Sequence, residues 1–174
     1  MGSRKRRRVE SARTGALFAV PALLLLTTAG CSEVDADRAA YNESMYGSAE
    51  VTDADFDDVI AEFTAVIEAD PTDAEAYFVR GNGYEDKDLY ELALADYNEA
   101  LRLDPEFVDA LVNRGYTYDE MAEYRLAIAD YDAALARDPE DGGAYFNRGV
   151  SYQNLGNQAK ADADFARAKA LGVE

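Results

Sequence analysis

The chain contains no histidine, no tryptophan and a single cysteine among its 174 residues. Without histidine it lacks the commonest general base and the commonest metal ligand. One cysteine cannot form an internal disulfide, so the fold has to rest on packing. The sequence also shows no nucleophile motif, no glycine-rich phosphate loop and no cluster of metal ligands. These absences argue against an enzyme and predict neither a cofactor nor a metal.

Positive charge is scarce as well, and it is unevenly placed. The chain has 17 Lys and Arg against 35 Asp and Glu. Six of the basic residues but only one acid lie in residues 1–30, so the rest of the chain is even more acidic than the whole. So acidic a body repels phosphate groups, which argues against nucleic acid as a partner.

Residues 1–30 have the order of a secretory signal peptide. The basic cluster "SRKRRR" is followed by an apolar run of about 15 residues and then by small residues. A membrane-spanning helix needs about 20 apolar residues, and Pro21 weakens a helix here further. We therefore expect residues 1–30 to be a cleaved signal peptide rather than a permanent transmembrane anchor.

The end of this segment, "TTAGC", resembles the lipobox of bacterial lipoproteins. The resemblance implies that the thiol of Cys31 receives a diacylglycerol and that Cys31 becomes the new N-terminus. The protein would then be lipid-anchored in the bacterial cell envelope, on the extracytoplasmic side and at the outer membrane if the organism has one. The alternative is an ordinary signal peptide in which Cys31 is incidental. Residues 31–53 are polar and acidic and predict a tether.

A short motif that contains arginine, glycine and tyrosine occurs three times at a constant spacing. The recurring positions are Arg80, Arg114 and Arg148; Gly81, Gly115 and Gly149; Tyr84, Tyr118 and Tyr152; and Pro71, Pro105 and Pro139. This pattern resembles the tetratricopeptide repeat, whose period is about 34 residues. The resemblance implies an all-α, right-handed superhelix of antiparallel helix hairpins. It places a repeat domain at residues 54–174, with full repeats at about 74–107, 108–141 and 142–174 and a half or degenerate repeat before them.

Two features of the repeat have structural explanations. A glycine inside a helix costs about 1 kcal/mol, so we expect it where a side chain would collide with the partner helix. An aspartate follows each arginine at the same distance along the chain, which predicts a salt bridge within each hairpin. The pairs are Arg80 with Asp96, Arg114 with Asp130 and Arg148 with Asp164. Taken as exposed, such a pair contributes only about 0–1 kcal/mol.

The two ends of the array differ. In the half repeat, Phe63 has the register of Tyr97. The apolar side of this single helix has to be buried against another helix. The same register puts Gly47 at the glycine position, which predicts a degenerate helix at residues 38–49. At the other end, Asp162 and Lys169 occupy positions that are apolar in the inner repeats. This polar face ends the array and favours a monomeric body.

On each first helix, a second row of side chains lies one residue after the row that faces the core. The tetratricopeptide resemblance implies that it lines a concave groove that binds a peptide segment of a partner protein. Asparagines there could bond a ligand backbone, and carboxylates would favour basic residues on the ligand. The alternative is a solvated helix face. The candidate groove residues are Phe78, Asn82, Glu85, Val112, Asn113, Tyr116, Asp119, Phe146, Asn147 and Val150.

The sequence therefore predicts an envelope-anchored adaptor or assembly factor. The alternatives are a structural or oligomerisation module without a peptide ligand, and a regulator that acts by occlusion. One tetratricopeptide subfamily grips the C-terminal carboxylate of chaperone tails with lysines and arginines in the groove. Phe78 and Asn147 stand at positions that would need to be basic, so we do not expect that activity.

Overall fold

A computed structural model describes residues 53–173, and this part of the chain consists of seven helices without a strand. The predicted all-α fold is confirmed. The signal peptide, Cys31, the predicted helix at 38–49 and all but the last residue of the tether lie outside the described residues. The helices are α2 (Asp53–Ala69), α3 (Ala74–Glu85), α4 (Tyr90–Leu103), α5 (Val108–Glu120), α6 (Tyr124–Arg137), α7 (Gly142–Asn154) and α8 (Gln158–Ala170).

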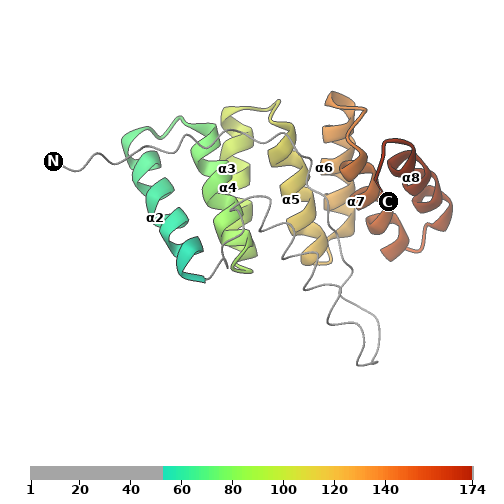
Figure 1. The fold of residues 1–174 in the computed structure, drawn as a ribbon, viewed down its shortest axis with the longest axis horizontal. Coiled ribbons are helices and arrows are strands. Elements are labelled where there is room, and N and C mark those ends of the chain that lie inside the picture. Colours follow the sequence, from blue (N-terminus) through green and yellow to red (C-terminus); the bar gives the residue numbers. More distant parts are fainter. Residues whose placement is uncertain (1–52, 174) are drawn as a thin grey trace, which may run out of the picture.

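The helices stack side by side as a row of hairpins (Figure 1). The most extensive contacts lie within the pairs α3–α4, α5–α6 and α7–α8, and each pair packs on the next. The first helices also contact one another, α3 with α5 and α5 with α7. In the described part, no corresponding contact joins α4 with α6 or α6 with α8. The first helices therefore lie on the inner side of the curve and the second helices on the outer side.

An aromatic ring packed on a glycine joins the two helices of each hairpin. A Cβ atom added to Gly81 would lie 2.7 Å from the ring of Tyr97, and one added to Gly115 would lie 2.8 Å from that of Tyr131. Both tyrosines are fully buried. Any side chain at the glycine would separate the two helices, which is the physical reason for the recurring glycine.

Each recurring arginine connects three helices rather than two. Arg114 donates from Nε and Nη2 to both carboxylate oxygens of Asp130, at 2.8 and 2.6 Å, within its own hairpin. Its Nη1 donates to Asn98 Oδ1 of the preceding hairpin at 2.6 Å. Arg80 bonds in the same way to Asp96 and Thr64, and Arg148 to Asp164 and Asp132.

The description of these pairs as exposed was wrong, because the aspartate side chains are only 7–9% exposed. A carboxylate held there without its arginine would be an unpaired buried charge. The pairs therefore tie successive hairpins together and matter more for stability than surface ion pairs do.

Turns between first and second helices share an unusual backbone. Asp88, Ala122 and Gly156 occupy the same position in successive repeats, and their φ angles are +57°, +59° and +75°. This left-handed conformation suits glycine and is strained for alanine. Elsewhere, Asp73 and Asp141 cap first helices by accepting from Ala76 N and Ala144 N. Within residues 53–173, no helix is both long enough and apolar enough to cross a membrane.

Candidate functional site: the inner face of the array

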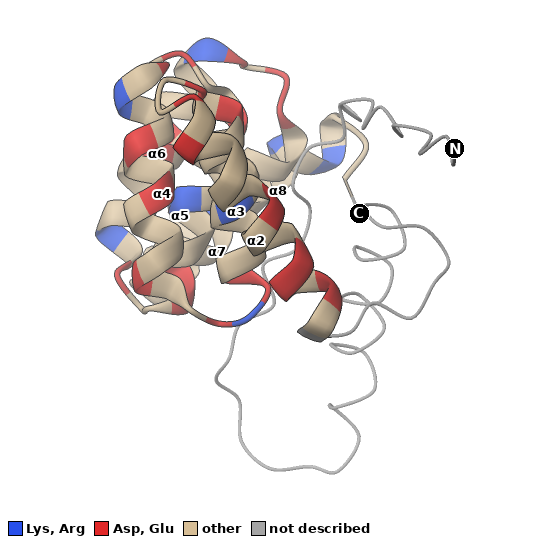
Figure 2. Cartoon of the chain, turned by 90° about the vertical axis from the view of Figure 1, so that its left-hand side faces the viewer, with Lys and Arg blue, Asp and Glu red and all other residues tan. Residues whose placement is uncertain are grey.

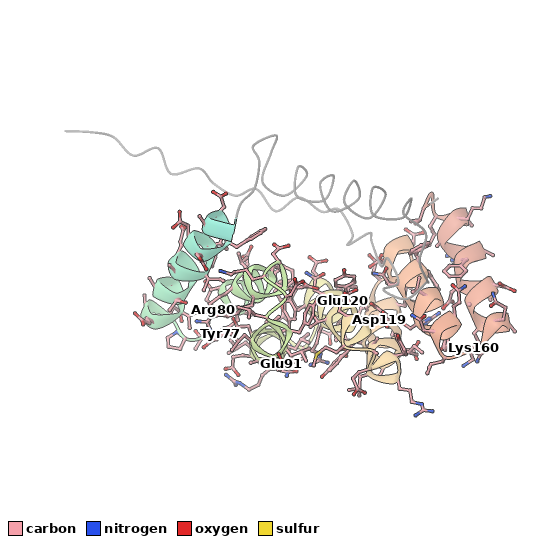
Figure 3. The ribbon with its side chains drawn as sticks, turned by 90° about the horizontal axis from the view of Figure 1, so that it is seen from below. Tyr77, Arg80, Glu91, Asp119, Glu120 and Lys160 are labelled. Carbon is pink, nitrogen blue, oxygen red and sulfur yellow. The ribbon has the colours of Figure 1, made fainter. Side chains whose placement is uncertain are left out.

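The ten candidate groove residues all lie on α3, α5 and α7, the helices of the inner side. Figure 3 labels Asp119 and its neighbour Glu120 on α5. We call this surface the inner face. The structure divides the ten residues into two groups. Half-exposed are Phe78, Glu85, Tyr116, Asp119 and Phe146. Buried are Asn82, Val112, Asn113, Asn147 and Val150.

The interpretation that Asn82 and Asn113 present free amides to a ligand was wrong. Asn113 Nδ2 donates to Asn82 Oδ1 at 2.9 Å, so these two side chains join α5 to α3. Asn82 Oδ1 also accepts from the hydroxyl of Tyr97 at 2.7 Å. Both asparagines are buried. They hold neighbouring hairpins in register. The hydrogen bonds that they make offset the cost of removing these polar side chains from water.

A ladder of hydroxyl and carboxylate groups runs along the inner face between hairpins. Asp119 Oδ2 accepts from the hydroxyl of Tyr131, in the same hairpin, at 2.8 Å. Ser151 of the next hairpin donates from Oγ to the same carboxylate at 2.7 Å. One hairpin earlier, Glu85 lies 2.7 Å from the Tyr97 hydroxyl. The Thr117 hydroxyl lies 3.4 Å from the other oxygen of Glu85 and 3.0 Å from the backbone oxygen of Asn113. We call these contacts the inner-face ladder.

The geometry around Glu85 favours a protonated carboxyl group. The Tyr97 hydroxyl lies 2.7 Å from both Asn82 Oδ1 and Glu85 Oε2, yet it has one proton to donate. Both short contacts are hydrogen bonds if Glu85 carries a proton and donates it to Tyr97 while Tyr97 donates to Asn82. Burial raises the pKa of Glu85 to about 8, which agrees with this arrangement. Asp119 has a separate donor for each contact, and burial raises its pKa only to about 6.

Acidic residues gather on the inner face. They are Glu85 and Asp86 on and after α3, with Asp119 and Glu120 on α5, and Glu85 is neutral while it holds its proton. Burial first, and then the charges of Glu120 and Glu85, raise the pKa of Tyr116 above its ordinary value. Figure 2 shows Asp and Glu spread over the helices and turns, with far fewer Lys and Arg. The arrangement favours cationic over anionic groups in a ligand.

Aromatic side chains on the inner face are partly engaged in packing. Phe78 lies 4.8 Å from Phe107 and 6.0 Å from Tyr97, between ring centroids. Phe146 lies 5.5 Å from Phe165. Both residues are nevertheless half-exposed. Tyr116, between them in the array, is also half-exposed. The inner face therefore offers aromatic surface held rigidly by the core, beside carboxylates.

Sequence reasoning missed Thr117, Ser151 and the hydroxyl groups of Tyr97 and Tyr131 as parts of this face. A signal for them exists in the repeat alignment. In the last repeat, Gln153 takes the place of the acid and Phe165 that of the tyrosine. The acid and the hydroxyl are thus both replaced in α7 and α8, the last hairpin of residues 53–173. As for metals, no group of three His, Cys, Asp or Glu side chains in residues 53–173 is placed to hold an ion.

Comparison with known families supports the repeat assignment directly. One model described as a TPR repeat matches residues 81–121, and two described as tetratricopeptide repeat match residues 108–141 and 130–163. A search of curated protein sequences found no relative.

Solved structures with this fold are numerous, and three show its range. A crystal structure of MamA protein is 24% identical, with a TM-score of 0.65 over 80% of this chain and 75% of that one. The Arabidopsis OM64 TPR domain is 26% identical, with a TM-score of 0.56 over 57% of this chain and 82% of that one. The second TPR of Spaghetti (RPAP3), solved with the HSP90 peptide SRMEEVD, is 28% identical, with a TM-score of 0.55 over 56% of this chain and 91% of that one.

Proposed function

Because this chain is a tetratricopeptide repeat protein, and so a protein–protein interaction module, we propose that it is an adaptor or assembly factor of the cell envelope. Its inner face would hold a peptide segment of a partner protein. The observation that carries the proposal is the row of half-exposed aromatic and acidic side chains on α3, α5 and α7. Phe78, Phe146 and Asp119 are held by ring contacts or hydrogen bonds, so these side chains lose little conformational entropy when a ligand binds.

The charge of the inner face defines the class of peptide. Asp86, Asp119 and Glu120 would attract lysine and arginine side chains, and Tyr116 supplies an aromatic surface for a cation. The peptide solved with RPAP3, SRMEEVD, carries acidic residues near its C-terminus. Such a peptide would be repelled here. We therefore propose a ligand with basic residues next to apolar ones.

Binding can be tested with variants of the half-exposed residues. Tyr116→Ala and Phe146→Ala should each remove a partner captured from envelope extract by the wild-type protein. Leu92→Ala and Leu126→Ala are matched controls, because these leucines lie on the outer-side helices α4 and α6 and are 48% and 47% exposed. Folding is checked by helical circular dichroism. An unchanged partner list with both inner-face variants would remove the inner face from the proposal.

The charge preference can be tested separately with synthetic probes. Fluorescence anisotropy of an Arg- and Leu-containing peptide should rise on addition of the protein, and that of an Asp- and Leu-containing peptide should not. The affinity for the basic peptide should fall as salt is raised, because salt screens exposed charges. Equal binding of the two peptides would contradict an electrostatic basis for selection.

Envelope anchoring through Cys31 is a part of the proposal that stands on the sequence alone. The basic, apolar and small-residue regions that precede Cys31 support it. Cys31→Ser should move the protein from the membrane fraction to the soluble fraction or leave it as an unprocessed precursor. If the variant and the wild type have the same mass and the same distribution, Cys31 is not the anchor.

A structural or oligomerisation module is the second candidate. The exposed leucines on the outer side, Leu92 and Leu126, are the observation that favours it. Light scattering of the protein purified in detergent, compared with the Leu92→Ala and Leu126→Ala variants, tests it. An assembly that these variants dissolve would favour the module over the adaptor.

A further inference from the structure

Helix α2 occupies the place of a second helix in a repeat. The Nη1 atom of each recurring arginine donates to the second helix of the preceding hairpin, always at the same sequence separation. Arg114 bonds to Asn98 on α4, and Arg148 bonds to Asp132 on α6. Arg80 bonds in the same manner to Thr64 on α2 at 3.2 Å. Helix α2 therefore stands to α3 as α4 stands to α5.

Within residues 53–173, α2 lacks the first helix that such a position requires. Its only helical neighbour there is α3. Phe63 has the register of Tyr97 and Tyr131, which are fully buried against the glycines of their own first helices. Phe63 itself is half-exposed. Phe63 thus has the position at which the other hairpins pack an aromatic ring on the glycine of a first helix.

The chain before α2 supplies a segment that matches this position. The sequence separation between Gly47 and Phe63 equals that between Gly81 and Tyr97 and that between Gly115 and Tyr131. A helix at residues 38–49 would leave residues 50–52 as the connection to α2. The turns 121–123 and 155–157, which join α5 to α6 and α7 to α8, have the same length.

We propose that residues 38–49 of the same chain pack on α2, with Gly47 against Phe63, and complete a fourth hairpin. Tyr46 stands where the other hairpins have arginine, so this hairpin lacks the ion pair and is held by apolar packing. The repeat array then gains a first helix at its N-terminal end. Only residues 32–37 remain between Cys31 and the folded body, and a segment of that length spans at most about 22 Å.

Hydrogen exchange of the complete chain in detergent, read by mass spectrometry, tests this placement. The amides of residues 38–49 should exchange at least about tenfold more slowly than those of residues 32–37. Phe63→Ser and Gly47→Phe should each abolish the difference, and Leu92→Ser, which changes an exposed apolar residue of α4, should preserve it. Protection of α5 to α8 in all variants shows that the array remains folded.

Two results would overturn the proposal. In one, residues 38–49 of the wild type exchange as fast as residues 32–37, so no helix covers α2. In the other, protection of Phe63 and its neighbours on α2 depends on protein concentration and light scattering gives twice the monomer mass. The face would then be covered by a second copy of the chain rather than by residues 38–49.

Discussion

At the scale of single residues, the recurring glycine and arginine have different physical roles. Gly115 is a steric requirement, because the ring of Tyr131 occupies the space of a side chain. Arg114 is a polar requirement, because it neutralises the buried carboxylate of Asp130 and also reaches Asn98. Neither role involves a ligand, and both explain why the same residues recur in every hairpin.

Replacing the glycine tests the steric role. Gly115→Ala should lower the free energy of unfolding by about 1–3 kcal/mol, because the added methyl group would lie 2.8 Å from the Tyr131 ring and force the helices apart. Urea denaturation measures this change. On an open helix surface the same substitution would raise stability by up to about 1 kcal/mol. A stabilised variant would therefore show that the ring and the glycine do not pack as described.

Replacing the arginine tests the polar role. Arg114→Met should cost about 3–5 kcal/mol, because it leaves Asp130 charged and buried without its partner. The double variant Arg114→Met with Asp130→Leu should recover much of that loss, since no unpaired charge remains. Arg102→Met is the control, because Arg102 pairs with Glu99 on the surface, where an ion pair contributes little to stability. If Arg114→Met and Arg102→Met lower the free energy of unfolding equally, Arg114 does not neutralise a buried charge.

At the scale of elements, the hairpins were predictable because their determinants repeat. Glycine, tyrosine and proline recur with one period, so the helix pairs follow from the sequence without knowledge of neighbours. The inner face was less predictable. Asn82 and Asn113 have the polarity of surface residues, and only the approach of α5 to α3 buries them against each other. Burial of a polar residue depends on its partner, which the local pattern does not contain.

The turn between α5 and α6 offers a stabilising change at this scale. Ala122 adopts a φ of +59°, where Gly156 stands in the next repeat. Ala122→Gly should raise the free energy of unfolding by about 1 kcal/mol, because a left-handed backbone costs alanine about 1–2 kcal/mol and glycine loses part of that gain through its unfolded-state entropy. Thermal unfolding measures it. Ala133→Gly, within helix α6, is the control and should destabilise. Destabilisation by both changes would refute the strain at Ala122.

At the scale of the whole molecule, stability depends on the contacts between each hairpin and the next. In a repeat array each unit contacts only its neighbours, so inter-hairpin contacts decide whether the array folds as one body. The arginine Nη1 contacts act on one side of the stack. The inner-face ladder acts on the other, through Glu85 with Thr117 and Asp119 with Ser151. The ladder contains two carboxyl groups whose pKa burial raises to about 8 and about 6, so it makes the joint between hairpins sensitive to pH near neutrality.

The sign of that sensitivity follows from Glu85. Burial raises its pKa from 4.5 to about 8 in the folded protein, so the folded state holds a proton that the unfolded state has released. This stabilisation is complete below about pH 4.5 and is lost as the pH rises through 8, with a slope of at most about 1.4 kcal/mol per pH unit. Asp119, with a pKa of about 6, completes its titration earlier. Between about pH 7 and 8 the slope therefore reports mainly on Glu85.

Glu85→Gln should remove that slope, because glutamine keeps the shape and the donor of the protonated acid without titrating. The amide can donate to the Tyr97 hydroxyl as the protonated carboxyl group does. The variant should match the wild type near pH 5 and exceed it in stability above pH 8, as measured by urea denaturation across this range. Glu91→Gln, at an exposed position of α4, should leave the wild-type slope intact. If Glu85→Gln keeps the slope, the proton is held elsewhere, and the ladder does not couple the hairpins to pH.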